Sequence, residues 1–139
     1  FVQDNLSESS KGVIRGLHWQ ASPFGQGKLV SCLSGSILDV AVDIRKESPT
    51  FGQHISVELN SREQFALWVP EGFAHGFQTL DDNTALIYHH TSYYTPNTEG
   101  GVRYDDTALN IMWQLPPFNI SPKDLLYPLI NQNFEAINL

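Results

Sequence analysis

Short apolar segments separated by turn residues recur along most of the chain. In residues 54–59 apolar and polar side chains alternate strictly, as they do in a half-buried β-strand. Residues 37–44 are rich in β-branched side chains, and turn-forming residues follow at 46–52. The turn signals recur at the spacing typical of an all-β sandwich or barrel. We therefore expect strands over residues 27–33, 37–44, 54–59, 65–70, 76–80 and 84–90.

Helical periodicity is absent from the sequence before Ser121. At that point the sequence Ser-Pro-Lys-Asp predicts a short helix, because Ser is a favoured N-cap and Pro fits the first helical position. No linker, internal repeat or low-complexity segment divides the chain. The sequence therefore predicts a single domain over residues 1–139, of the all-β class, with a short C-terminal helical segment.

Composition and charge restrict the class of protein. The chain has 139 residues, of which 41% are hydrophobic, enough for one buried core. Its net charge of −7 argues against nucleic-acid binding, although a few local cations can still hold a phosphate. No apolar run reaches the roughly 18 residues of a membrane span, and no signal-peptide pattern is present. The single cysteine, Cys32, lies in an apolar segment, so we expect it to be buried and the protein to be cytoplasmic.

Three ionisable residues, Arg15, His18 and Lys28, lie in segments that otherwise read as strand and turn. A histidine suits general-base catalysis, because the ordinary pKa of imidazole is close to neutral pH. A lysine beside a carbonyl stabilises developing negative charge, and an arginine binds phosphate through two parallel hydrogen bonds. Each residue alone is also explained by an ordinary core or surface role. Together they indicate a catalytic site for an anionic substrate.

The loop at residues 70–75 has the form P-x-G-x-x-H, which resembles the second motif of cupin jelly rolls. Many cupins bind a metal through an H-x-H motif, but here Gln20 stands two residues after His18. His89 and His90 are adjacent in a predicted strand, so their side chains point to opposite faces and cannot chelate one ion. We therefore expect no metal and no other cofactor.

Longer motifs occur in a fixed order along nearly the whole chain. They are F-V-Q-D-N at 1–5, R-G-L-H-W-Q at 15–20, Q-G-K-L-V at 26–30, D-V-A-V-D-I-R at 39–45, S-P-T-F-G at 48–52, P-E-G-F-A-H-G-F at 70–77, Y-Y-T-P at 93–96, E-G-G at 99–101 and S-P-K-D at 121–124. Together they resemble the dTDP-4-dehydrorhamnose 3,5-epimerase family. The resemblance implies a cupin-type jelly-roll barrel, a homodimer and a metal-independent reaction.

The resemblance also implies roles for individual residues. His18 matches the catalytic base, Asp124 the acid that orients it, Tyr88 the proton donor and Lys28 the cation near the substrate's keto oxygen. We expect a nearby cation to lower the pKa of the Tyr88 hydroxyl. Other matches line the nucleotide-sugar site: Gln3, Asp4, Asn5, Arg15, His75, Glu99 and Lys123, with Tyr93 as a wall of the thymine pocket.

The implied reaction inverts C3 and C5 of dTDP-4-dehydro-6-deoxy-D-glucose, giving dTDP-4-dehydro-L-rhamnose. Both hydrogens are α to the C4 carbonyl, so removal of either gives an enolate on the same oxygen, and one lysine serves both steps. Three alternatives stay open. They are a relative that inverts only C3 or only C5 of a dTDP-4-keto-6-deoxy sugar, a non-catalytic sugar-binding cupin, and a metal-dependent cupin oxygenase or isomerase.

The sequence departs from the family pattern at its start. The family carries a segment with a G-D-x-R-G-x-F-x-E motif upstream of F-V-Q-D-N, and this segment contributes to substrate binding and to strand exchange across the dimer. The sequence begins at Phe1 without it. We therefore expect a chain of this extent to bind substrate weakly and to form a disturbed dimer.

Overall fold

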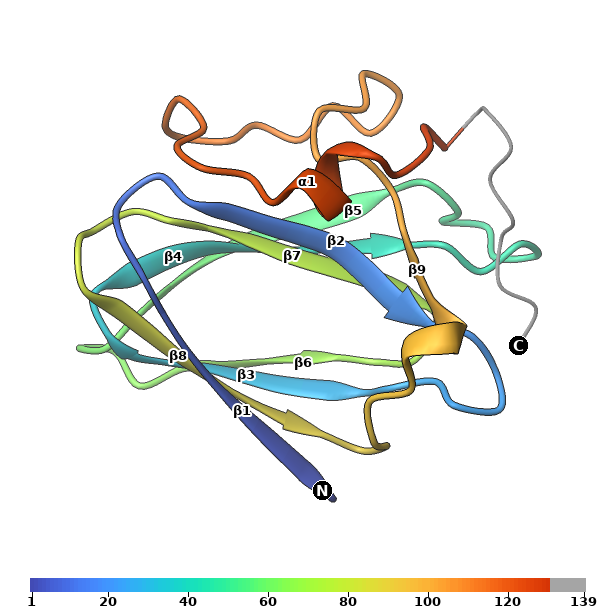
Figure 1. Cartoon of the computed structure of the whole chain (residues 1–139), viewed down its shortest axis with the longest axis horizontal. Helices are drawn as coiled ribbons and strands as arrows, with labels where there is room; N and C mark the ends of the chain where they lie inside the picture. Colours follow the sequence, from blue (N-terminus) through green and yellow to red (C-terminus); the bar gives the residue numbers. More distant parts are fainter. Residues whose placement is uncertain (131–139) are drawn as a thin grey trace.

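Nine β-strands in two antiparallel sheets form the framework of residues 1–130, the part of the chain that the computed structural model describes (Figure 1). The four-stranded sheet has the order β1-β8-β3-β6. Its strands are β1 (Gln3–Ser9), β8 (Thr84–His90), β3 (Lys28–Ser34) and β6 (Ala66–Val69). The five-stranded sheet has the order β5-β4-β7-β2-β9. Its strands are β5 (His54–Asn60), β4 (Ser36–Asp43), β7 (Phe73–Thr79), β2 (Ile14–Gln20) and β9 (Glu99–Gly101). The two sheets face each other as a cupin-type jelly-roll barrel, which confirms the predicted fold class.

Two short helices complete the described part of the chain. The 3-10 helix η1 (Pro96–Thr98) leads into β9, and α1 (Pro122–Leu125) lies beside β2 (Figure 1). The side chain of Ser121 accepts a hydrogen bond from the backbone N–H of Asp124, and Pro122 occupies the first helical turn. The predicted short helix is therefore confirmed, with the expected cap.

Apolar side chains form two clusters on the two faces of the five-stranded sheet. One cluster fills the space between the sheets and contains Cys32, which is buried as predicted. The other lies on the outer face, under the chain that follows β9. Strand β4 is therefore buried on both faces, and its sequence is a nearly continuous apolar run. Figure 1 shows the chain after β9 passing over this outer face, while no segment covers the outer face of the four-stranded sheet within residues 1–130.

One local expectation is wrong, and another departs from the structure at a single residue. The predicted loop at 70–75 ends early, because β7 already begins at Phe73 and His75 therefore belongs to a strand. The alternation in residues 54–59 predicted a half-buried strand, and β5 is one, with Leu59 buried and Glu58 exposed; only Ile55 departs from the pattern, because it is 54% exposed. Ile55 pairs with the buried Ala41, but β5 is the edge strand of its sheet and the opposite sheet does not cover this end.

Candidate active site

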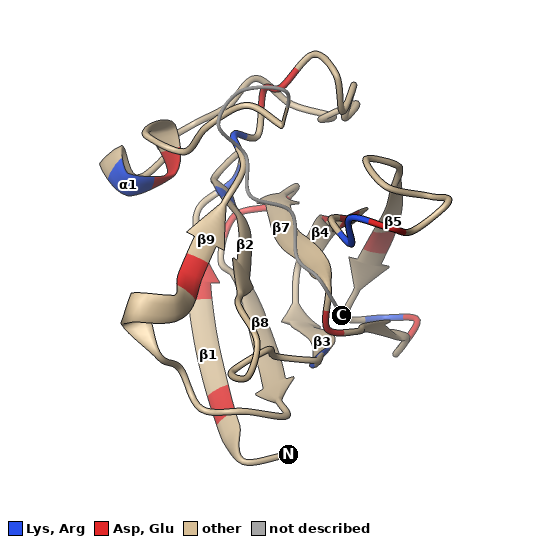
Figure 2. Cartoon of the chain, turned by 90° about the vertical axis from the view of Figure 1, so that its right-hand side faces the viewer, with Lys and Arg blue, Asp and Glu red and all other residues tan. Residues whose placement is uncertain are grey.

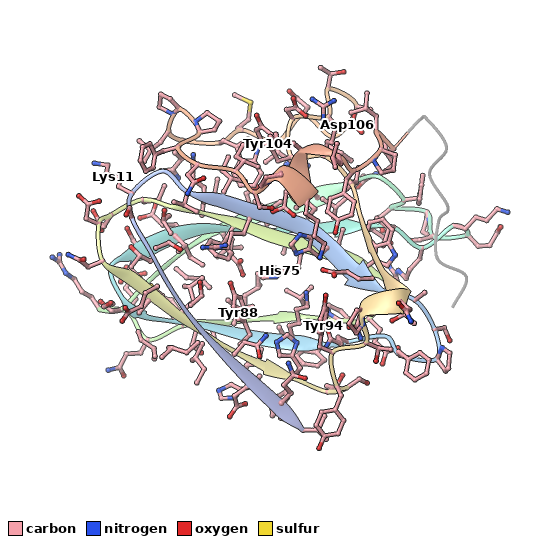
Figure 3. The ribbon with its side chains drawn as sticks, in the orientation of Figure 1. Lys11, His75, Tyr88, Tyr94, Tyr104 and Asp106 are labelled. Atoms are coloured by element: carbon pink, nitrogen blue, oxygen red, sulfur yellow. The ribbon has the colours of Figure 1, made fainter. Side chains whose placement is uncertain are left out.

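A pocket opens between the two sheets, at the end of the barrel that the apolar cluster leaves unfilled. Figure 3 shows His75 of β7 and Tyr88 of β8 directed toward each other across this space, and their ring centroids are 5.9 Å apart. Both sheets therefore contribute side chains to one site. The lining residues are Asn5, Arg15, His18, Trp19, Gln20, Gln26, Lys28, His75, Gly76, Phe77, Tyr88, His90, Tyr94 and Glu99.

His18 forms a short ion pair with Asp124, a residue 106 positions away in the chain. His18 Nε2 lies 2.6 Å from Asp124 Oδ1, and the other carboxylate oxygen accepts a hydrogen bond from the backbone N–H of Gly16 at 3.1 Å. Burial acts to raise the pKa of Asp124, but the hydrogen bond and charge of His18, the Gly16 backbone N–H and the Ser121 side chain outweigh it and hold the pKa below its usual range. The carboxylate thus stays charged, and it leaves Nδ1 of His18 as the ring nitrogen free for proton transfer.

The backbone before His18 is shaped by close approach to β7. The pairing of β2 with β7 is interrupted between Arg15 and His18, and Gly16 has a φ of +104°. A Cβ at Gly16 would lie 2.5 Å from the backbone oxygen of His75, so only glycine fits there. This irregularity presents the Gly16 N–H to Asp124 and places His18 opposite His75 in the register.

A second charged group borders His18 on the side of β9. Glu99 Oε1 lies 3.9 Å from His18 Nδ1, while Glu99 Oε2 accepts hydrogen bonds from Lys123 Nζ at 2.5 Å and from the Tyr94 hydroxyl at 2.7 Å. Figure 2 shows this acidic position on β9 close to the basic position on α1. Burial acts to raise the pKa of Glu99, but these two hydrogen bonds outweigh it and lower the pKa. The carboxylate is thus ionised at the edge of the pocket.

Lys28 and Tyr88 come from neighbouring strands of the four-stranded sheet. Burial lowers the pKa of Lys28 to about 8, and the carboxylates of Asp39 and Glu99 oppose that shift. At neutral pH Lys28 is therefore mainly a cation. Burial and the Asp39 carboxylate raise the pKa of Tyr88 far above its ordinary value, against a smaller opposite effect of Arg15. The expectation that a nearby cation lowers the Tyr88 pKa is thus wrong, because desolvation of the phenolate dominates.

His75 forms the second short His–Asp contact of the pocket. His75 Nε2 lies 2.6 Å from Asp39 Oδ1, and both side chains are buried. The contact fixes the orientation of the ring against Tyr88. Among residues 1–130 there is no cluster of three His, Cys, Asp or Glu side chains placed to hold a metal ion.

Most of the residues proposed from the sequence lie in or beside the pocket. The lining includes Asn5, Arg15, His18, Lys28, His75, Tyr88 and Glu99. Asp124 and Lys123 contact His18 and Glu99, respectively. Gln3 donates a hydrogen bond from Nε2 to Asn5 Oδ1 at 3.0 Å, and its Oε1 accepts one from the Tyr94 backbone N–H at 2.8 Å.

Two of the proposed residues, Asp4 and Tyr93, do not line the pocket. Asp4 lies on the opposite face of β1 from Asn5 and pairs with His89 at 2.6 Å. Tyr93 is 67% exposed, and only its backbone carbonyl is engaged by Gln20, at 3.1 Å. The neighbouring residue Tyr94 lines the pocket instead. Strand alternation explains the placement of Asp4, whereas the orientation of Tyr93 is set by an irregular loop that no sequence pattern predicts.

The pocket also contains residues that the sequence did not single out, namely Gln20, Gln26, His90 and Tyr94. For His90 a signal was available, because residues two apart in a strand share a face and Tyr88 was already a candidate. Gln20 and Gln26 hold the surrounding loops, through hydrogen bonds from Nε2 to the backbone oxygens of Phe24 and Ser92.

Within residues 1–130 the structure contains no helix that is long and apolar enough to span a membrane.

Comparisons with known proteins identify the family of this chain. A family profile described as dTDP-4-dehydrorhamnose 3,5-epimerase matches residues 1–132. The curated dTDP-4-dehydrorhamnose 3,5-epimerase of Salmonella typhimurium is 52% identical over 135 residues, which are 95% of this chain and 73% of that protein.

Solved structures match the fold as closely. One is an epimerase from Legionella pneumophila in complex with dTDP-4-keto-L-rhamnose, with a TM-score of 0.95 and 46% identity over 100% of this chain and 75% of that one. Another is a 3′-monoepimerase from Streptomyces bikiniensis in complex with dTDP-quinovose, with a TM-score of 0.88 and 34% identity over 93% of this chain and 66% of that one. From the profile match and these identities, the chain belongs to the dTDP-4-dehydrorhamnose 3,5-epimerase family.

Proposed function

We propose that this chain inverts C3 and C5 of dTDP-4-dehydro-6-deoxy-D-glucose to give dTDP-4-dehydro-L-rhamnose. The observation that carries the proposal is the pairing of His18 with the buried Asp124, which places His18 in one pocket with Lys28 and Tyr88. A sugar-binding module has no need of a base coupled to a buried carboxylate. The names of the related enzymes support the same activity.

In the first step His18 acts as the base. Asp124 holds the ring with the hydrogen on Nε2, so the lone pair of Nδ1 is available to take the proton from C3 or C5. The electron pair of the broken C–H bond forms a C=C bond to C4, and the π electrons of the C4 carbonyl move to its oxygen. Asp124 then stabilises the imidazolium, and the Lys28 ammonium stabilises the enolate oxygen.

In the second step Tyr88 protonates the same carbon from the opposite face of the sugar. Tyr88 comes from the four-stranded sheet and His18 from the five-stranded sheet, so the two groups flank a ligand held between the sheets. The raised pKa keeps Tyr88 in the protonated form that donation requires. Inversion leaves an imidazolium and a phenolate, and solvent returns the proton from one to the other before the next turnover.

The remaining pocket residues hold the nucleotide diphosphate. Arg15 is the exposed cation of the lining and suits a phosphate. Gln3, Asn5 and Lys123 offer polar groups beside it. Tyr94, rather than Tyr93, is the aromatic wall available to the thymine ring, because it lines the pocket and its hydroxyl is held by Glu99. Asp4 is not assigned a contact with the substrate.

We also propose that the chain forms a homodimer through the outer face of the four-stranded sheet. Leu6 of β1 is 66% exposed and Trp68 of β6 is 48% exposed on this face, where a partner would bury them. A Leu6→Glu variant is expected to sediment as a monomer at concentrations where the unaltered protein is a dimer. Equal sedimentation of the two would contradict this assignment.

The unpaired thiol of Cys32 fits a reducing compartment, and we place the protein in the cytoplasm.

Inversion at a single carbon is the second candidate. It is favoured by the similarity to the 3′-monoepimerase from Streptomyces bikiniensis. Both reactions use a base, an enolate and a proton donor, so the pocket chemistry alone serves either. The number of carbons that exchange hydrogen with solvent distinguishes them.

The test is proton NMR of dTDP-4-dehydro-6-deoxy-D-glucose incubated with the protein in D₂O. We expect deuterium at both C3 and C5 of the epimerised product, and none with a His18→Asn variant. Deuterium at one carbon alone would support the monoepimerase. No exchange by the unaltered protein, at a concentration where dTDP binding is measured, would overturn the proposed activity and support a binding module.

A further inference from the structure

His90 is a buried pocket residue without a role in the mechanism above. It is 6% exposed and lines the pocket. Neither ring nitrogen has a hydrogen-bond partner among the groups of residues 1–130. Buried polar side chains in native proteins are almost always hydrogen-bonded. An unpartnered imidazole in the wall of a substrate pocket therefore indicates that the substrate completes its hydrogen bonding.

The strand register places His90 next to Lys28. The two residues are direct partners in the antiparallel pairing of β8 with β3, so their side chains stand side by side on the inner face of the sheet. Tyr88, two residues earlier in β8, shares this face, and its ring centroid is 6.0 Å from that of His90. A substrate oxygen bound by Lys28 is therefore close to the His90 ring.

Several titratable groups surround His90, and together they keep it neutral. Burial, the Lys28 ammonium and His75 lower its pKa to about 4, and His89 acts weakly in the same direction. Asp4 on β1 acts in the opposite direction, but it is mostly exposed. Above about pH 5 the ring is uncharged and carries one N–H donor and one acceptor nitrogen. A neutral donor can share an oxygen with Lys28 without the repulsion that a second cation would suffer.

We infer that His90 is a second hydrogen-bond donor to the C4 oxygen of the substrate, acting beside Lys28. This inference rests on the proposed epimerase function and adds a catalytic residue to it. When His18 removes the proton from C3 or C5, the C4 carbonyl oxygen gains the π electron pair. The N–H of His90 then donates a stronger hydrogen bond to that oxygen, while its proton stays on nitrogen. The bond weakens again when Tyr88 protonates carbon and the carbonyl re-forms.

The experiment compares His90→Leu and His90→Gln with the unaltered protein, with His54→Leu as the matched control. His54 begins the edge strand β5 and lies outside the pocket. His90→Leu removes the donor at similar volume, and we expect kcat for deuterium exchange to fall about 10²-fold, as for loss of one oxyanion donor. The Kd for dTDP should stay within about twofold, because His90 is not among the residues that we assign to the nucleotide. His90→Gln restores an N–H donor and should recover kcat to within about tenfold of the unaltered protein.

Three outcomes overturn the inference. One is a His90→Leu variant that keeps kcat within about threefold of the unaltered protein. Another is equal loss of kcat in the Leu and Gln variants with normal dTDP binding, which assigns His90 a role in shape alone. The third comes from the unaltered protein with ¹⁵N-labelled histidine, a measurement that needs no variant to fold. We expect the His90 N–H resonance to move downfield with the keto sugar nucleotide but not with dTDP alone, and an unmoved resonance contradicts the contact. In each of these outcomes the unaltered protein still exchanges hydrogen with solvent, so only the role of His90 fails. If the proposed epimerase function fails, the unaltered protein itself shows no exchange.

Discussion

Replacement of Asp124 by Asn tests the coupling on which the proposed mechanism depends. The change keeps the size of the side chain and keeps an oxygen for the Gly16 N–H. It also removes the negative charge 2.6 Å from His18 Nε2 and presents an amide N–H in its place. That N–H favours the tautomer of His18 with the hydrogen on Nδ1, so the ring nitrogen facing the pocket is no longer a base.

The size of the effect follows from the geometry of the pair. The Asp124 side chain is 4% exposed, so solvent screens the pair only weakly. Two unit charges centred about 4 Å apart interact by about 4 kcal/mol at an effective dielectric constant of about 20. This energy stabilises the imidazolium formed in the transition state, and its loss corresponds to a fall of about 10³-fold in kcat. The tautomer effect acts in the same direction, so about 10³-fold is the smallest loss expected.

The assay is the initial rate of deuterium incorporation in D₂O at saturating substrate, together with the Kd for dTDP. The matched control is Asp105→Asn, because Asp105 pairs with Arg103 on the surface and lies outside the pocket. We expect Asp105→Asn to retain full activity, and both variants to bind dTDP normally. A rate for Asp124→Asn within about tenfold of the unaltered protein would refute the coupling of the pair. Loss of dTDP binding in that variant would show that Asp124 supports the pocket rather than the proton transfer.

Three further predictions follow from the site. The pKa of Lys28 in the folded protein is about 8, so its ammonium form is lost above that pH. We therefore expect kcat to fall as the pH rises from 7 to about 9.5. A flat profile of kcat against pH would contradict the enolate-stabilising role. Tyr88→Phe should still exchange hydrogen with solvent, because His18 can return a deuteron to the same face, but it should not invert the carbon; epimerised product in the NMR spectrum would remove Tyr88 as the donor. Gly16→Ala should lower the free energy of unfolding by more than about 3 kcal/mol in urea, since both a φ of +104° and a contact at 2.5 Å oppose a Cβ. The matched variant Gly52→Ala, with a φ of +78° but only an ordinary contact of 3.8 Å between the added Cβ and Ile130 Cδ1, should cost only about 1–2 kcal/mol. Equal losses in the two variants would show that close approach at Gly16 is unimportant.

Local patterns in the sequence determined most of the strands. Apolar runs bounded by Gly, Ser and Pro place them because side-chain alternation and turn chemistry are properties of a few neighbouring residues. The same period of two correctly separates His89 from His90, with His89 paired to Asp4 outside and His90 lining the pocket. The burial of Cys32 and the short helix after Ser121 were predicted from such local signals too.

The resemblance of the motifs, rather than any local pattern, connected His18 with Asp124. Their 106-residue separation carries no periodic signal, and only the packing of α1 beside β2 brings the two side chains to 2.6 Å. The orientation of Tyr94 toward the pocket, and of Tyr93 away from it, likewise depends on two residues far away in the chain. Gln3 accepts a hydrogen bond from the Tyr94 backbone N–H, and Gln20 donates one to the Tyr93 backbone oxygen.

The sequence by itself determined which residue types are available, where the strands lie and to which family the motifs are similar. The tertiary structure alone decided the protonation behaviour of the site. The desolvation of a group depends on how much of the chain from both sheets surrounds it. For Tyr88, Lys28 and His90 desolvation has a larger effect on the pKa than any single nearby charge, so the pKa of Tyr88 rises and those of Lys28 and His90 fall. The residues next to these groups in the sequence do not predict the pKa shifts, because the groups that exclude water from the pocket come from strands at distant positions in the sequence.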